Sequence, residues 1–228
     1  MVIEIATIGE AVAIGAACWA IISGVGAWKR EFIGKRKIEL AEEMLATFLE
    51  MNDAVAFIRN PFSSSNEGRT RERGENENPE HSELLDRAYI VFERYEQRRE
   101  VFVRLNTLKY RFVAVFGGEA EALFTDIART VNSIFASANA LGTRYWPQQG
   151  RVRMDDAQFQ RHLDAMERHE GVFWDSYGDD DEIRNALAQY KERLEEIIGP
   201  CFEEPMKTYG ILTKRLPCLC NKKRQPDA

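Results

Sequence analysis

The feature that most constrains this chain is a run of eighteen residues without any charge, from Ala11 to Trp28. As an α-helix, at about 1.5 Å per residue, the run is about 27 Å long, close to the hydrocarbon thickness of a bilayer. It has no polar face over five turns, whereas a helix in the core of a soluble protein usually has one. We therefore predict a single N-terminal transmembrane helix, with residues 1–30 as the anchor.

Two other interpretations of this run stay open. A cleaved signal peptide fits the small residues Ala11 and Ala13, which resemble a cleavage site, but no basic residue precedes the apolar run. A lipoprotein signal would end at Cys18, but Gly15 stands where a larger aliphatic residue is usual, and the apolar run continues past the cysteine. Both are less favoured than a membrane span.

The charges that follow the run predict its orientation. Cationic residues cluster on the cytoplasmic side of membrane helices, and Trp residues favour the headgroup interface. The cations after Trp28 are Lys29, Arg30, Lys35, Arg36 and Lys37. We expect a single-pass protein of the cell inner membrane, bound to the lipid bilayer, with its N-terminus outside and its C-terminal bulk in the cytoplasm.

Small residues recur at four-residue intervals along the predicted span. Such lines let a second helix approach closely, which predicts a homo-oligomer formed through the membrane helix. A span rich in alanine and glycine also produces them by chance. The two lines are Gly9, Ala13 and Ala17, and Ala16, Ala20 and Gly24.

The rest of the chain shows apolar residues at spacings of three and four, which predicts helices. No alternating strand pattern is found, so the predicted fold class is all-α: an antiparallel helical bundle with long helices over residues 31–200. The expected helices cover residues 38–60, 82–116 and 119–141, a segment that starts at Asp155 or Asp156 and carries Phe159 and Phe173, and a last helix from Ile183 to a stop at Gly199-Pro200. A break is expected at Pro147 and Gly150.

Two segments fall outside the predicted bundle helices. Residues 60–80 are rich in Ser, Asn, Gly and charge, which predicts a mobile loop. The basic RTRER run in this loop is nearly cancelled by glutamates, so solvation is favoured over contact with acidic lipids. Residues 201–228 are predicted to be a flexible basic tail; Cys201, Cys218 and Cys220 leave acylation or metal binding open.

No catalytic signature is visible, and we expect no cofactor and no metal site. The net charge of −6 gives no support to nucleic-acid binding. His162 and His169 are seven residues apart, whereas zinc ligands on a helix are usually three or four apart. The acidic run Asp179–Glu182 precedes a predicted helix, where carboxylates meet free backbone N–H groups, so capping is its expected role.

The stretch AYIVFERYEQRREVFVRLNTLKYRFVAVFG, from Ala88 to Gly117, resembles uncharacterised bacterial proteins with an N-terminal span and a charged helical cytoplasmic region. The similarity covers residues 29–199 and implies a bacterial inner-membrane location. It transfers no catalytic or binding residue.

The leading hypothesis for function is a membrane-anchored scaffold or sensor whose helical bundle binds a protein, without catalytic activity. Arg98 and Arg99 interrupt the apolar stripe of residues 82–116 between Tyr95 and Phe102. The predicted partner-binding residues are Tyr95, Arg98 and Arg99. A subunit of a homo-oligomeric membrane pore is the alternative, suggested by the small-residue lines and by Glu10 at the membrane boundary. An enzyme with a metal site hidden in the bundle ranks third.

Overall fold

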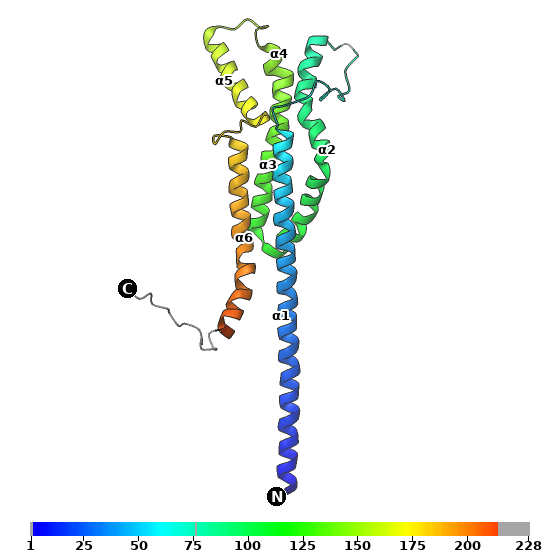
Figure 1. The fold of residues 1–228 in the computed structure, drawn as a ribbon, viewed down its shortest axis with the longest axis vertical. Helices are drawn as coiled ribbons and strands as arrows, with labels where there is room; N and C mark the ends of the chain where they lie inside the picture. The colour runs from blue at the N-terminus through cyan, green and yellow to red at the C-terminus, as the bar shows by residue number, and fades with distance from the viewer. Residues whose placement is uncertain (1, 76, 214–228) are drawn as a thin grey trace, which may run out of the picture. The chain divides into compact units, whose positions relative to one another are not determined.

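The computed structural model describes residues 2–75 and 77–213, without the side chains of residues 2–13, 22, 23, 27, 30 and 203–213. All regular secondary structure in this part of the chain is helical, which confirms the all-α part of the predicted fold class (Figure 1). The helices are α1 (Val2–Ile58), α2 (Pro79–Phe116), α3 (Gly118–Ala140), the π-helix η1 (Leu141–Tyr145), α4 (Trp146–Gln148), α5 (Asp156–Phe173) and α6 (Glu182–Thr213).

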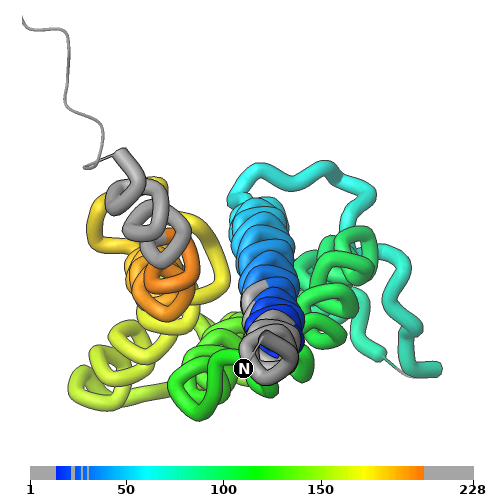
Figure 2. Tube along the Cα trace, turned by 90° about the horizontal axis from the view of Figure 1, so that it is seen from below, coloured from blue at the N-terminus to red at the C-terminus, as the bar shows by residue number. Residues whose placement is uncertain are grey.

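The chain divides into two compact units, one of residues 43–198 and one of residues 1–42 with 199–228. Within the 43–198 unit, the end of α1, α2 and α3 run in alternating directions (Figure 1). Helices α5 and α6 come one after the other and both run in the same direction as α2 (Figure 1). The view along the helices shows α1, α2, α3 and α6 as neighbours (Figure 2). This arrangement confirms the prediction of a helical bundle.

The core of the 43–198 unit is built from the stripes that the sequence predicts. Phe48 of α1, Phe112 of α2, Leu123 of α3 and Leu194 of α6 are each almost fully buried. The Phe112 ring stacks on Phe116 at a centroid distance of 4.2 Å, and such aromatic pairs stabilise a core beyond their buried area. The helical periodicity therefore identifies the core faces correctly.

The predicted helix ends are right at some positions and wrong at others. Asp155 caps α5 with a capping box to Gln158, as expected. However, α2 starts at Pro79 rather than near Ser82, because Asn78 caps it and proline suits the first helical turn. The stop predicted at Gly199-Pro200 is wrong, since α6 continues to Thr213. Pro200 removes one backbone donor, and the turns on either side carry the helix past it.

The membrane span predicted from Ala11 to Trp28 is not supported. This stretch is helical within α1, but among the residues whose side chains are described, no helix is both long enough and apolar enough to cross a bilayer. Residues 11–13, 22, 23 and 27 of the stretch lie outside that description.

The break predicted at Pro147 and Gly150 begins at Gln149, so Gly150 lies in it as expected, whereas Pro147 stays helical because the chain continues through η1 and α4. A π-helix accommodates an extra residue in a helical run. Within η1, Gly142 is buried against α2, and a Cβ at this position would lie 2.6 Å from the Ala88 Cβ. Gly142 thus allows η1 and α2 to approach closely.

Replacing Gly142 with alanine is expected to lower the free energy of unfolding by about 1–3 kcal/mol, because two backbone segments must separate to admit one methyl group. Gly171→Ala is the matched control: this helical glycine has open space around its Cβ position, so alanine there is expected to be neutral or slightly stabilising. Denaturant unfolding of the full chain in mild detergent measures both. Equal stability of the two variants would contradict the close approach.

Candidate functional site

The predicted partner-binding residues lie on one stretch of α2 in different environments. Tyr95 is half-buried and its ring contacts Phe135 of α3 edge-on, at 5.1 Å between centroids. Arg98 is exposed and lies over the Phe57 ring at 4.9 Å, while exposed Arg99 lies 3.7 Å from Glu96. Tyr95 lines a groove of about 150 Å³ between α2 and α3, with Phe102 and Lys109. The partner role of these residues stays a prediction.

The small-residue lines predicted to pack membrane helices lie in α1. Ala16, Ala17, Ala20 and Gly24 are exposed, and Gly24 has open space where a Cβ would be. The other two positions, Gly9 and Ala13, lie in the part of α1 whose side chains are not described, and Cys218 and Cys220 of the tail lie outside the described residues.

The two histidines considered for metal binding both contact one aromatic ring. The Tyr145 ring of η1 lies 5.5 Å from the His162 ring and 5.0 Å from the His169 ring. His169 Nδ1 is 3.0 Å from Ser137 Oγ, and burial, with a smaller effect of Arg168, lowers the pKa of His169. Within the described residues, no three His, Cys, Asp or Glu side chains are grouped to hold a metal ion.

The acidic run contributes a helix cap and a buried ion pair. Asp181 Oδ1 accepts a hydrogen bond of 2.8 Å from the backbone N–H of Arg184, which is the capping role expected. In addition, both carboxylate oxygens accept from Arg59, at 2.8 and 2.9 Å, and both side chains are almost fully buried. Burial alone would raise the pKa of Asp181, but the hydrogen bonds from Arg59 and from two backbone N–H groups lower it to about 2.

Arg59, which directly follows α1, also donates hydrogen bonds to the backbone at the end of α5. Its Nε donates to the carbonyl oxygen of Val172 at 2.8 Å, and its Nη2 donates to the carbonyl oxygens of Gly171 and Trp174 at 2.8 Å each. The backbone is joined here too, because the Asp175 N–H donates to the Arg59 carbonyl oxygen at 2.8 Å. One buried guanidinium thus joins α1, α5 and the start of α6.

A second buried arginine, Arg94 of α2, donates hydrogen bonds to the backbone at the C-terminal end of α1. Arg94, 2% exposed, donates to the carbonyl oxygens of Ile58 and Asn60 and to that of Phe62 at 2.8 Å. Its guanidinium also pairs with Glu67 at 2.8 Å, and this hydrogen bond lowers the pKa of Glu67. Cationic donors suit the free carbonyls at a helix C-terminus.

The loop predicted to be mobile makes many contacts with the first turns of α2. Asp86 of α2 accepts hydrogen bonds from Arg71 at 3.0 Å and from Arg73. The backbone N–H of Gly68 donates to Glu93 at 2.6 Å. Gly68 has a φ of +81°, and a Cβ there would lie 1.9 Å from the Asp86 carbonyl oxygen, so only glycine fits.

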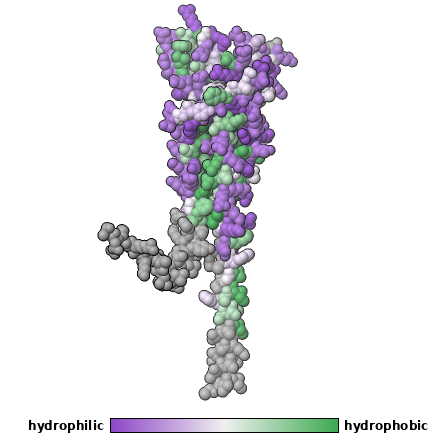
Figure 3. All heavy atoms as spheres, in the orientation of Figure 1, coloured by the Kyte–Doolittle hydropathy of each residue, from purple (hydrophilic) through white to green (hydrophobic). Residues whose placement is uncertain are grey.

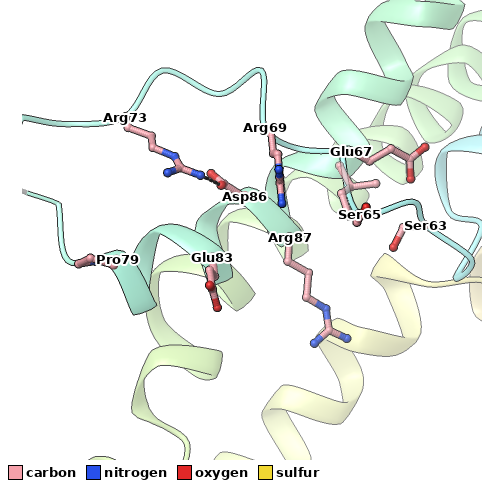
Figure 4. A pocket seen from close by; sticks show the side chains of 10 residues that line it. Ser63, Ser65, Glu67, Arg69, Arg73, Pro79, Glu83, Asp86 and Arg87 are labelled. Carbon is pink, nitrogen blue, oxygen red and sulfur yellow. Dashed lines mark hydrogen bonds and ion pairs between the residues drawn. The ribbon is translucent and has the colours of Figure 1, made fainter.

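Between this loop and α2 lies a polar pocket of about 550 Å³ (Figure 4). This volume lies in the range of small-molecule sites, about 300–1,000 Å³. The pocket lining combines arginines, serines and carboxylates with two apolar residues: Ser63, Ser65, Glu67, Arg69, Arg73, Pro79, Glu83, Asp86, Arg87 and Ile90.

The pocket was missed in the sequence because its charges nearly cancel along the chain. The RTRER run, residues 69–73, is recognisable, but glutamates surround it. Only the fold shows which cations are neutralised by ion pairs and which are not. Arg59, Arg94 and Arg87 carry no distinguishing sequence signal, because each lies among the many charged residues of a helical chain.

Comparison with known protein families, with curated proteins and with solved structures finds no match for this chain.

Proposed function

We propose that this protein is a non-enzymatic scaffold or sensor that is attached to a lipid bilayer by the N-terminal half of α1 and binds a protein through its helical bundle. The observation that supports attachment is the exposed apolar surface of α1. Ile14, Trp19, Ile21, Val25 and Trp28 are each at least 60% exposed. Exposed apolar surface of this kind marks membrane or protein contact sites.

The described side chains of this part of α1 form a mainly hydrophobic surface, whereas the surface of the 43–198 unit seen in the same view is mainly hydrophilic (Figure 3). Transfer of each large aliphatic side chain from water to an apolar environment contributes about 1.5–3 kcal/mol. Several such side chains on one helix favour a bilayer over water strongly.

The cations after Trp28 support the side of the membrane on which the bundle is proposed to lie. Lys29 follows Trp28 directly, and the cluster Lys35, Arg36 and Lys37 comes shortly after it. Basic residues next to a membrane segment favour the cytoplasmic face, where anionic lipids attract them. The proposed location is therefore the inner face of the cell membrane.

The groove between α2 and α3 supports the proposed partner binding. It exposes part of the Tyr95 and Phe135 rings beside polar Asn106 and Lys109. Aromatic side chains with a polar rim are typical of protein interfaces. The exposed guanidinium groups of Arg98 and Arg99 lie on the same helix.

Three lysines in place of Ile14, Ile21 and Val25 are expected to release the full-length protein from isolated membranes in alkaline carbonate, while the unmodified chain stays in the pellet. Each lysine at the centre of a membrane helix costs about 2.5–3.5 kcal/mol on insertion scales. The released fraction, measured by immunoblot, reports attachment.

The matched control carries lysine at Val103, Val152 and Phe159, which are exposed apolar residues of the 43–198 unit. It is expected to stay with the membrane. Release of the unmodified chain by carbonate would overturn the proposed attachment. Digestion of the bundle by protease added outside intact cells would overturn the proposed location.

A further inference from the structure

We infer that the polar pocket between residues 63–73 and α2 binds a small organic phosphate, with Arg69 and Arg87 as its cationic contacts. This inference concerns the 43–198 unit alone and does not depend on membrane attachment. Three observations carry it: the ion pairing of the lining residues, the way Arg87 is held, and the polar groups left without a partner.

The carboxylates of the pocket are largely neutralised by arginines. Asp86 is paired with both Arg71 and Arg73, and Glu67 is paired with buried Arg94. Arg71 also pairs with Glu77 at 2.8 Å. These pairs leave Glu83 as the carboxylate of the lining that has no arginine partner among the described residues.

Two arginines of the lining, in contrast, have no carboxylate partner among the residues that the structure describes. Arg69 makes neither an ion pair nor a hydrogen bond there, and Figure 4 shows its side chain pointing from the loop toward α2. Arg87 leaves α2 in another direction (Figure 4). Guanidinium groups bind phosphate oxygens through pairs of parallel N–H donors, which makes arginine the preferred residue for phosphate recognition.

Arg87 is held in place by aromatic rings. Its guanidinium carbon lies 4.7 Å from the centroid of the Trp146 ring and 6.0 Å from that of Trp174. A guanidinium stacked on a ring keeps its N–H groups available at the edge of the plane. The Trp146 indole is itself fixed, since its Nε1 donates to Glu170 at 2.7 Å. The two rings thus flank the guanidinium of the exposed Arg87 side chain.

The remaining polar groups fit the organic part of such a ligand. Ser63, Ser65 and Glu83 are exposed side chains of the lining, and among the described residues the two hydroxyls make no hydrogen bond to protein atoms and Glu83 makes no ion pair. Serine hydroxyls donate to phosphate oxygens, and a free carboxylate accepts from a hydroxyl or an ammonium group. The N-terminus of α2 at Pro79 adds the positive end of a helix dipole.

Two sources present the same chemistry, a phosphate monoester: a soluble metabolite and the headgroup of phosphatidic acid. Titration calorimetry of the full chain in mild detergent at low salt tests the first source, with inorganic phosphate, AMP and adenosine as probes. AMP is expected to bind with a dissociation constant at or below about 1 mM, and adenosine much more weakly. Nanodiscs that contain phosphatidic acid or only phosphatidylcholine test the second source.

Arg69→Gln and Arg87→Gln are each expected to weaken phosphate-dependent binding about tenfold, since one charge-assisted contact is lost. Arg153→Gln is the control: it removes an exposed arginine outside the pocket and is expected to leave binding and the unfolding temperature unchanged. A thermal melt of each variant separates loss of binding from loss of folding. Absence of binding to all phosphate probes and to phosphatidic acid nanodiscs, or equal binding by all three variants, would overturn the inference.

Discussion

Asp181→Asn is expected to lower the free energy of unfolding by about 3–5 kcal/mol, one of the two largest effects of a single substitution in this chain. The substitution keeps the size of the side chain but removes its charge and turns an amide N–H₂ toward Arg59. The Arg59 guanidinium, 1% exposed, then has no anion to neutralise it. An uncompensated charge in a protein interior is strongly destabilising.

The matched control is Asp126→Asn. Asp126 also pairs with two arginines, Arg129 and Arg193, at 2.8 Å each, but its side chain is 28% exposed. Ion pairs that water can reach contribute about 0–1 kcal/mol, so this variant is expected to lose little stability. Denaturant unfolding of the full chain in mild detergent measures both variants. A similar decrease in the free energy of unfolding for both variants would show that burial does not make the Arg59 ion pair more important for stability than the exposed pair.

The pH dependence of the Asp181 pair provides an independent readout. Because the pKa of Asp181 is lowered to about 2 in the folded protein, the carboxylate stabilises the fold above its ordinary pKa, and this contribution is lost as the pH falls through the folded value. The lowered pKa contributes about 2 kcal/mol to the free energy of unfolding at neutral pH, and about 1 kcal/mol of this contribution is lost by pH 3. The Asn variant lacks this component, so the stability difference between the two proteins should shrink below pH 4. A difference that stays constant from pH 7 to pH 3 would contradict the assignment.

The sequence predicts the helices well and their connections poorly, for a physical reason. A helix that packs on a bundle repeats its apolar residues with the helical period, and Phe48, Phe112 and Leu123 follow that repeat. The ends of the helices depend on whether the local residues favour helical or turn conformations. Pro200 is tolerated inside α6. The helical chain also continues beyond α3 to Tyr145 as the π-helix η1, which no residue pattern predicts. Phe159, counted on an apolar face, is 44% exposed because α5 lies at the edge of the 43–198 unit.

The candidate site was much harder to foresee. Charged residues in the sequence are most simply expected to be solvated, and the tertiary partners of Arg59 lie more than a hundred residues away. The same holds for the pocket: Arg69 and Arg73 are close in sequence, yet only Arg73 is paired with Asp86. Which cation remains unpaired is decided by the path of the loop, and that path depends on Gly68 and Arg94.

Arg94→Met is expected to lower the free energy of unfolding by about 3–5 kcal/mol, because it breaks a buried ion pair and leaves the last carbonyl oxygens of α1 without donors. The Met side chain keeps most of the apolar stem, so the loss reports the guanidinium rather than a cavity. Arg94→Lys keeps the charge but not the planar set of donors, and its loss is expected to be intermediate. Arg99→Met, an exposed arginine of the same helix, is expected to change stability by less than about 0.5 kcal/mol.

Hydrogen exchange distinguishes this role of Arg94 from a general contribution to the core. Arg94 holds both the end of α1 and the loop that carries Glu67, so its loss should open residues 60–73 before the bundle unfolds. The Gly68 amide, which donates to Glu93, is expected to exchange much faster in Arg94→Met, while amides of α3 near Leu123 keep protection that falls only with global stability. Because this loop also forms one wall of the polar pocket, the same variant should lose phosphate-dependent binding even under conditions where the bundle is fully folded. Uniform acceleration across α1, α2 and α3, with the loop no faster than the core, would show that Arg94 stabilises the whole bundle and does not position the loop.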